Sequence, residues 1–142
     1  MQLSKKSEYA LRALLYMAKR RPQLVHTIQE ISQKEKIPMK FLEQIFPLLK
    51  QAGYVNSKRG LGGGHVLLRP SDQIRIFDII VLMENTLFLQ DRSTAADGGE
   101  SDIAINIFLR ELSTEIAQLL STRTIADLLD SAQALEGVSF EI

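Results

Sequence analysis

Two histidines, His26 and His65, are the side chains of this sequence best suited to acid–base chemistry near neutral pH. Neither has a nucleophile or a set of metal ligands close to it in sequence. The chain has no cysteine, so thiolate nucleophiles, thiolate metal sites and disulfides are excluded. His26 precedes a helix start and is expected at the surface, and His65 begins a strand. The sequence therefore argues against an enzyme and favours a binding function.

The glycine-rich stretch Gly60–Gly64 is the other chemical candidate, because such loops can bind phosphates. A Walker loop requires Lys-Ser/Thr after its last glycine, and a dinucleotide fingerprint starting here would need a glycine where His65 stands. An apolar strand follows the glycines, not a helix. With Lys58 and Arg59 at its base, the stretch instead predicts a hairpin tip that approaches DNA, with Arg59 in the minor groove. An ordinary flexible hairpin is the alternative.

The positive charges are concentrated in the first half of the chain. Residues 1–70 contain 13 Lys and Arg against 4 Glu, a balance of 13 − 4 = +9. Because the whole chain has 17 charges of each sign, residues 71–142 balance at 4 − 13 = −9. Segregation of this size indicates a half that faces a polyanion, with the acidic half turned away or occupied by a partner. A chance asymmetry of solvated surfaces is the alternative.

Helical periodicity predicts the elements that carry these charges. A helix is expected over residues 7–20, a capping-box sequence at Thr27–Glu30 starts a short second helix, and a third runs from Pro38 to a stop at Gly53. Two short strands should follow. Two short helices joined by a tight turn and followed by a hairpin form a winged helix-turn-helix. In this motif the second of the two helices enters the major groove of DNA. The strands are expected over residues 54–59 and 65–69.

The third predicted helix carries the candidate base-reading residues. Lys40 can contact a phosphate or a guanine edge, Gln44 can pair with adenine, and Glu43 can accept a hydrogen bond from cytosine. Each could equally be solvated surface. Pro47 lacks an amide hydrogen and should kink or divide this helix. The full set of predicted DNA contacts is Lys5, Lys6, Lys40, Phe41, Glu43, Gln44, Lys58, Arg59, Gly60, Gly62 and Gly63.

The acidic half predicts a long helix with an uncovered apolar face. A mostly buried helix within 71–84 and an exposed loop over 86–101 come first. Apolar residues at heptad spacing then form a seam that exceeds what the head can cover. A partner helix is the simplest cover, and packing within one chain is the alternative. A last short helix is expected over 124–129. The predicted dimer contacts are Ile105, Leu109, Leu112, Ile116 and Leu119.

The sequence resembles the Rrf family of bacterial winged-helix transcription regulators, which includes IscR, NsrR and CymR. The resemblance implies homodimers crossed through the long helix, recognition helices in adjacent major grooves, and a wing arginine, here Arg59, in the minor groove. It rests on Leu3–Lys6 with Tyr9-Ala10, on Phe41–Phe46, on Gly53–Val55 and on Arg59–His65, and more loosely on Thr124–Leu128.

Two features depart from the family pattern. Members that sense iron, nitric oxide or redox state hold an iron–sulfur cluster through cysteines in the loop before the dimer helix, and the loop over 86–101 has none. Glu8 stands where some members recruit a carboxylate, but one oxygen ligand without thiolates does not hold a cluster. No metal or cofactor is therefore predicted. Pro47 is the second departure, and it bears on the groove angle of the recognition helix.

The predicted fold is mainly α with a small β-hairpin wing. It divides into a winged helix-turn-helix DNA-binding domain over 1–85, an exposed loop with a sensory role over 86–101, and a dimerisation helix with a last short helix over 102–142. The predicted function is a homodimeric, cluster-free transcription regulator that represses and has double-stranded operator DNA as its partner. A protein-interaction module using the same head is the alternative, and a nucleotide-using enzyme comes third. No apolar run approaches the roughly 20 residues of a membrane span, and a cytoplasmic protein is expected.

Overall fold

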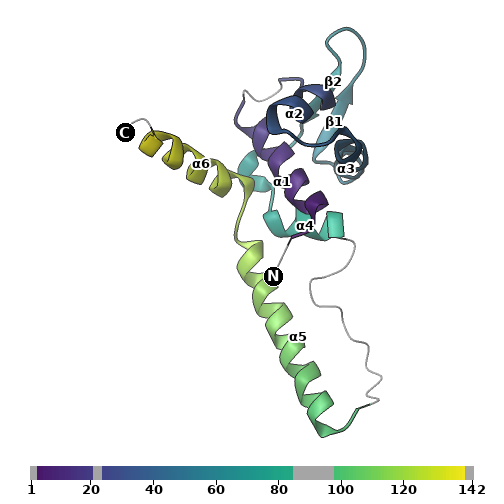
Figure 1. Cartoon of the computed structure of the whole chain (residues 1–142), viewed down its shortest axis with the longest axis vertical. Coiled ribbons are helices and arrows are strands. Elements are labelled where there is room, and N and C mark those ends of the chain that lie inside the picture. Colours follow the sequence, from purple (N-terminus) through teal and green to yellow (C-terminus); the bar gives the residue numbers. More distant parts are fainter. Residues whose placement is uncertain (1–2, 21–23, 85–97, 140–142) are drawn as a thin grey trace.

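The computed structural model describes residues 3–20, 24–84 and 98–139. Helices α1 to α4 and a hairpin form one head, α5 projects away from it, and α6 returns to lie beside α1 (Figure 1). This arrangement confirms the predicted, mainly helical fold with a β-hairpin wing. Within the described part of the chain, no helix is long and apolar enough to cross a membrane. The elements are α1 (Lys5–Ala18), α2 (Ile28–Glu35), α3 (Met39–Gln51), β1 (Val55–Lys58), β2 (Gly64–Leu67), a 3-10 turn η1 (Ser71–Gln73), α4 (Ile76–Glu84), α5 (Glu100–Ser121) and α6 (Ile125–Ser139).

The hydrophobic core lies at the centre of the head, where five helices contribute side chains. Each of these side chains is almost completely buried, and burying one such side chain stabilises the fold by about 1.5–3 kcal/mol. Met83 is also buried. The core therefore fixes the relative positions of α3 and the hairpin. Its central members are Leu14 of α1, Ile31 of α2, Phe46 of α3, Ile79 of α4 and Ile125 of α6.

The start of α2 follows the predicted capping sequence only in part. The hydroxyl of Thr27 accepts a hydrogen bond from the Glu30 amide at 3.0 Å, as expected. The Glu30 carboxylate, however, lies 2.5 Å from Nδ1 of His26. His26 is only 1% exposed, so its expected place at the surface is wrong. Its backbone pairs with that of His65, with N···O distances of 2.8 and 2.7 Å, and this pairing holds the His26 side chain beneath the hairpin.

Helix α3 runs unbroken through Pro47. The expectation that Pro47 divides this helix is wrong, because Phe46 and Leu49 on both sides of the proline are fully buried and anchor both halves to the core. The helix ends where predicted, at Gly53, whose φ of +81° suits glycine. The Tyr54 amide then donates to the Leu49 carbonyl at 2.9 Å. This turn leads directly into the hairpin.

The hairpin is antiparallel, with Val55 opposite Leu67 and Lys58 opposite Gly64. Both strands are slightly shorter than predicted, and the loop between them contains Gly60 and Gly62 at φ values of +98° and +77°. Glycine adopts such angles without steric cost. The glycines therefore shape the predicted wing.

Helix α5 is 22 residues long and contains no buried residue. Its C-terminal end is attached to the head, because the Ile125 amide donates to the Ile74 carbonyl at 2.9 Å and the Ile76 amide to the Arg123 carbonyl at 3.0 Å. The rest of α5 leads away from the head (Figure 1). Most of the loop predicted over 86–101 lies outside the described residues.

Helix α6 starts where a last short helix was predicted, just after Thr124, but it is longer than expected. Thr124 and Asp127 bond reciprocally: the Thr124 amide donates to Oδ2 of Asp127 at 2.8 Å, and the Asp127 amide donates to the Thr124 hydroxyl at 3.4 Å. The helix continues to Ser139, so the predicted end at Leu129 is wrong. An ion pair between residues far apart in sequence, Lys19 and Glu136 at 3.9 Å, contacts these extra turns.

Candidate nucleic-acid interface

The outer face of α3 presents the predicted base-reading side chains to solvent. Lys40, Glu43 and Gln44 are exposed, whereas Leu42 and Ile45, on the opposite face of the same helix, are completely buried. This division follows from the 3.6-residue period of an amphipathic helix. The exposed face can thus enter a DNA groove without disturbing the core.

Phe41 has a different position from its neighbours on α3. It is partly buried, and its ring meets that of Tyr9 edge-to-face with the ring centroids 5.0 Å apart. The Lys40 ammonium lies 5.4 Å from the centre of the Phe41 ring. Phe41 therefore joins α3 to α1 and supports Lys40, so its side chain is suited to orient the helix rather than to read a base.

The hairpin lies beside α3 and exposes its cations. Lys58, Arg59, Gly60 and Gly62 are exposed, and Gly63 is partly so. Between α3 and the hairpin lies a groove of about 360 Å³, which shows that the two elements share one side of the head. The groove is lined by Ile28, Glu43, Phe46, Pro47, Lys50, Ser57 and His65.

His65 is packed into the wall of this groove. Its ring lies 4.5 Å from that of Phe46, and burial, reinforced by the Lys50 charge, lowers the pKa of His65 below its usual value. The side chain is therefore neutral near physiological pH and carries no charge for a phosphate. The geometry therefore favours packing at the base of the wing, and not a DNA contact, as the role of His65.

Lys5 and Lys6 lie at the start of α1, apart from the hairpin. Lys5 is exposed and pairs with Glu8 at 3.3 Å, one turn before the Tyr9 that contacts Phe41. Lys6 is partly buried. The structure thus places Lys5 near the first turn of α3. The two lysines can extend a positive surface from α3 along α1, but they do not belong to the wing.

A carboxylate that the sequence did not single out fixes this end of α1. Oε1 of Glu84, at the end of α4, accepts hydrogen bonds from the Ser4 amide at 3.2 Å and from the Ser7 hydroxyl at 2.6 Å. Hydrogen bonding from the side chains of Ser4 and Ser7, with a smaller contribution from the Ser4 amide, holds the pKa of Glu84 below its usual value. No sequence signal could identify the contact, because Glu84 is remote from both serines along the chain.

Three interface cations remain without a carboxylate partner. Within the described ranges, no Asp or Glu oxygen lies within 4.0 Å of the charged groups of Lys40, Lys58 or Arg59. Arg12, by contrast, pairs with Glu35 at 3.8 Å. The charges of Lys40, Lys58 and Arg59 are therefore available to a polyanion.

Comparison with known proteins gives consistent matches. A family model named Rrf2, described as iron-dependent transcriptional regulator, matches residues 3–131. The HTH-type transcriptional regulator IscR of Sodalis glossinidius is 31% identical over 140 residues, which cover 97% of this chain and 84% of that protein. IscR of Cereibacter sphaeroides is 37% identical over 103 residues, covering 71% of this chain and 66% of the relative. The structure of CymR, the global cysteine regulator of B. subtilis, superposes with a TM-score of 0.75 at 26% identity and covers 92% of this chain and 98% of CymR.

The iron named in the family description finds no matching donor set here. Iron–sulfur clusters are held mainly by cysteine thiolates, and the chain contains no cysteine. In the part of the chain that the structure describes, no group of three or more His, Asp or Glu residues is arranged to hold a metal ion. The residues present do not fit a cluster.

Proposed function

The chain belongs to the Rrf2 family of transcriptional regulators, and we propose that it acts as a homodimeric repressor with α3 in the major groove and the hairpin in the minor groove of its operator. Family membership makes it a DNA-binding transcription regulator and not an enzyme. Repression is the simplest outcome, because a dimer bound across a promoter blocks access to it.

One observation carries the assignment of the site: the charges of Lys40, Lys58 and Arg59 are exposed and unneutralised on two adjacent elements. Unpaired cations on adjacent elements are suited to displace counterions from phosphates. Gln44, exposed on α3 one turn after Lys40, can add base recognition. In this proposal Arg59 enters the minor groove and Gln44 contacts an adenine.

The proposed dimer is supported by the uncovered face of α5. Leu119 is 66% exposed, Phe108 55% and Ile105 52%, in a helix with no buried residue. Apolar side chains exposed in a row along one helix favour association with another apolar surface. The same geometry supports a division into a DNA-binding domain over 1–85 and a dimerisation helix within 102–142.

The electrostatic part of the proposal is tested by a salt titration of DNA binding. The probe is the tightest-binding duplex selected from a random pool, and binding is followed by fluorescence anisotropy. Arg59→Ala should weaken binding and reduce the slope of log K against log salt by about 0.9, the value for one phosphate contact. Lys19→Ala is the matched control, because Lys19 is a head cation paired with Glu136 and should leave the slope unchanged. An Arg59→Ala protein with the wild-type slope and footprint would remove Arg59 from the site.

The base-reading part is tested separately with Gln44→Ala. If Gln44 reads one base, its loss should relax the preference at a single operator position and cost about 1–3 kcal/mol there. The measurement is binding to a set of duplexes that differ by single base pairs. Equal losses on all of them would assign Gln44 a positioning role.

A further inference from the structure

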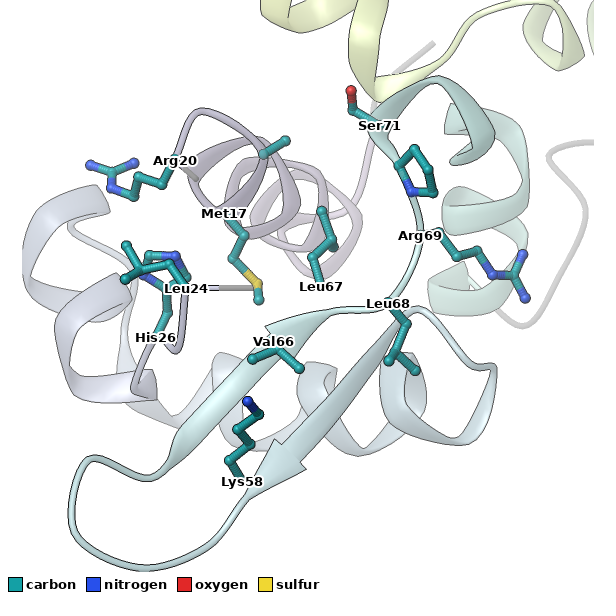
Figure 2. Close-up of a pocket in the computed structure, with 12 residues that line it drawn as sticks. Met17, Arg20, Leu24, His26, Lys58, Val66, Leu67, Leu68, Arg69 and Ser71 are labelled. Atoms are coloured by element: carbon teal, nitrogen blue, oxygen red, sulfur yellow. The ribbon is translucent and has the colours of Figure 1, made fainter. Parts of the chain in front are cut away.

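The hairpin has a second face with a pocket of its own. Because side chains alternate along a strand, Ser57 and His65 face the groove beside α3, whereas Lys58 and Val66 belong to the opposite face. On that face a pocket of about 560 Å³ opens between the hairpin and the end of α1 (Figure 2). Small-molecule sites commonly measure about 300–1,000 Å³, so this volume is sufficient for a metabolite.

The walls of this pocket leave apolar surface uncovered. Leu24 is 49% exposed and Leu68 is 51% exposed, and both line the space together with the buried side chains of Met17 and Val66. Figure 2 shows these four side chains around one opening. Such a surface gains free energy when an apolar group covers it.

The charge around the pocket is positive. None of the described residues that line it is acidic, and Lys58 extends from β1 toward Val66 without a carboxylate partner in the described ranges (Figure 2). Arg69, by contrast, points away and donates to the Gly53 and Ala52 carbonyls. Arg20 is stacked on the Tyr16 ring at 3.3 Å. Lys58 is therefore the cation most available to an anionic group in the pocket.

His26 adds a buried polar side chain to the pocket wall. His26 lines the pocket and is 1% exposed, and its Nδ1 is engaged with Glu30 at 2.5 Å. Its Nε2 is buried and has no hydrogen-bond partner. Buried polar atoms are normally paired, because an unpaired one has lost its water without compensation.

We infer that this pocket binds a small organic acid with an apolar body. The carboxylate contacts Lys58, and the body covers Leu24, Leu68 and Val66. Since Lys58 is also a proposed DNA contact, the acid competes with a phosphate for the same ammonium group and lowers the affinity for DNA. This competition rests on the proposed function, whereas binding of the acid does not.

Binding is tested on the free protein with octanoate, used well below the concentration at which it forms micelles. In methyl NMR spectra, octanoate should shift the resonances of Leu24, Leu68 and Val66 in a saturable way. The methyl groups of Leu61 and Leu119, which are exposed on the hairpin tip and on α5, should not move. Octan-1-ol, which has the same chain without the charge, should bind about fivefold more weakly, as expected for one partly exposed ion pair.

Two variants test whether Lys58 is the cation that binds the carboxylate. Lys58→Met should remove the preference for octanoate over octanol, and Lys50→Met, which removes an exposed cation from the groove on the opposite face, should retain it. Equal binding of octanoate and octanol to the wild type would overturn the inference, and so would an equal loss in both variants. If the methyl resonances of the pocket shift when the protein is concentrated without octanoate, the pocket is occupied by a second copy of the chain. That result would also overturn the inference.

The competition is measured by anisotropy with the selected duplex. Octanoate should weaken DNA binding by the wild type and have no effect on Lys58→Met. If octanoate shifts the pocket resonances but leaves DNA affinity unchanged, the competition is overturned. If the protein ignores DNA altogether, the proposed function fails, while the methyl shifts still decide the binding of the acid.

Discussion

Dimerisation through α5 can be tested with two isoleucines of equal exposure. Ile105 is 52% exposed and lies in the heptad seam, and Ile107 is 55% exposed on the same helix outside it. At 3.6 residues per turn they are separated by about 200° around the helix axis. A partner helix on the seam therefore covers Ile105 and leaves Ile107 in water.

The size of the effect follows from the uncovered half of the side chain. Complete burial of an isoleucine side chain is worth about 1.5–3 kcal/mol, so covering the exposed half of Ile105 contributes about 1 kcal/mol in each copy. Ile105→Ala should thus weaken a symmetric dimer by about 2 kcal/mol, or about 30-fold in its dissociation constant. Alanine is the better helix former, so the helix itself is not weakened.

Sedimentation equilibrium on the wild type and on both variants provides the dissociation constants. Ile105→Ala should shift the monomer–dimer midpoint by the stated factor, and Ile107→Ala should stay close to the wild type. Equal shifts in both variants would show that the seam does not define the interface. A wild type that stays monomeric at every concentration would refute the proposed dimer.

Three further predictions concern the head and α6. The hydrogen bonds of Ser4 and Ser7 depress the folded-state pKa of Glu84 below its usual 4.5, so their stabilisation is present above pH 4.5 and lost as the pH falls through the folded-state pKa. Glu84→Gln should accordingly lower the Tm at pH 7, and thermal melts in strong acid should show no difference. At Gly63 an added Cβ would lie 2.5 Å from the Lys58 carbonyl oxygen, so Gly63→Ala should strain the hairpin by about 1–3 kcal/mol, lower the Tm and weaken DNA binding measured by anisotropy. Thr124→Ala should cost about 1 kcal/mol in urea unfolding through loss of the α6 cap, whereas Thr114→Ala, on the exposed side of α5, should cost nothing measurable.

The features predicted correctly from the sequence are those that short-range interactions determine. The Thr27 and Thr124 caps and the Gly53 stop each depend on residues within a few positions, so the local sequence is sufficient. The hairpin was predictable for the same reason, because its glycines and its alternating strands are adjacent in the chain. The helices and strands that carry the candidate site could therefore be predicted from the sequence alone.

The errors concern contacts between distant segments. His26 is followed by a helix cap, which suggests a surface position, but pairing with His65 draws it inside. The length of α6 depends on packing against α1 and on the Lys19–Glu136 pair. Among the described side chains of α6, only the apolar residues Ile125 and Leu128 pack against the core. Pro47 weakens α3 locally, and burial of its neighbours outweighs that loss. Tertiary packing decided all three cases.

The position of the acidic charge explains how a chain of zero net charge can still attract DNA. Helix α5 carries Glu100, Asp102, Glu111 and Glu115 against Arg110, and it leads away from the head (Figure 1). Its 22 residues span about 33 Å at about 1.5 Å per residue. The Debye length at physiological salt is about 8 Å, so carboxylates at the far end do not cancel the field of Lys40, Lys58 and Arg59. At lower salt the same carboxylates repel phosphates over a longer range, which favours encounters in which the head, and not α5, meets the DNA.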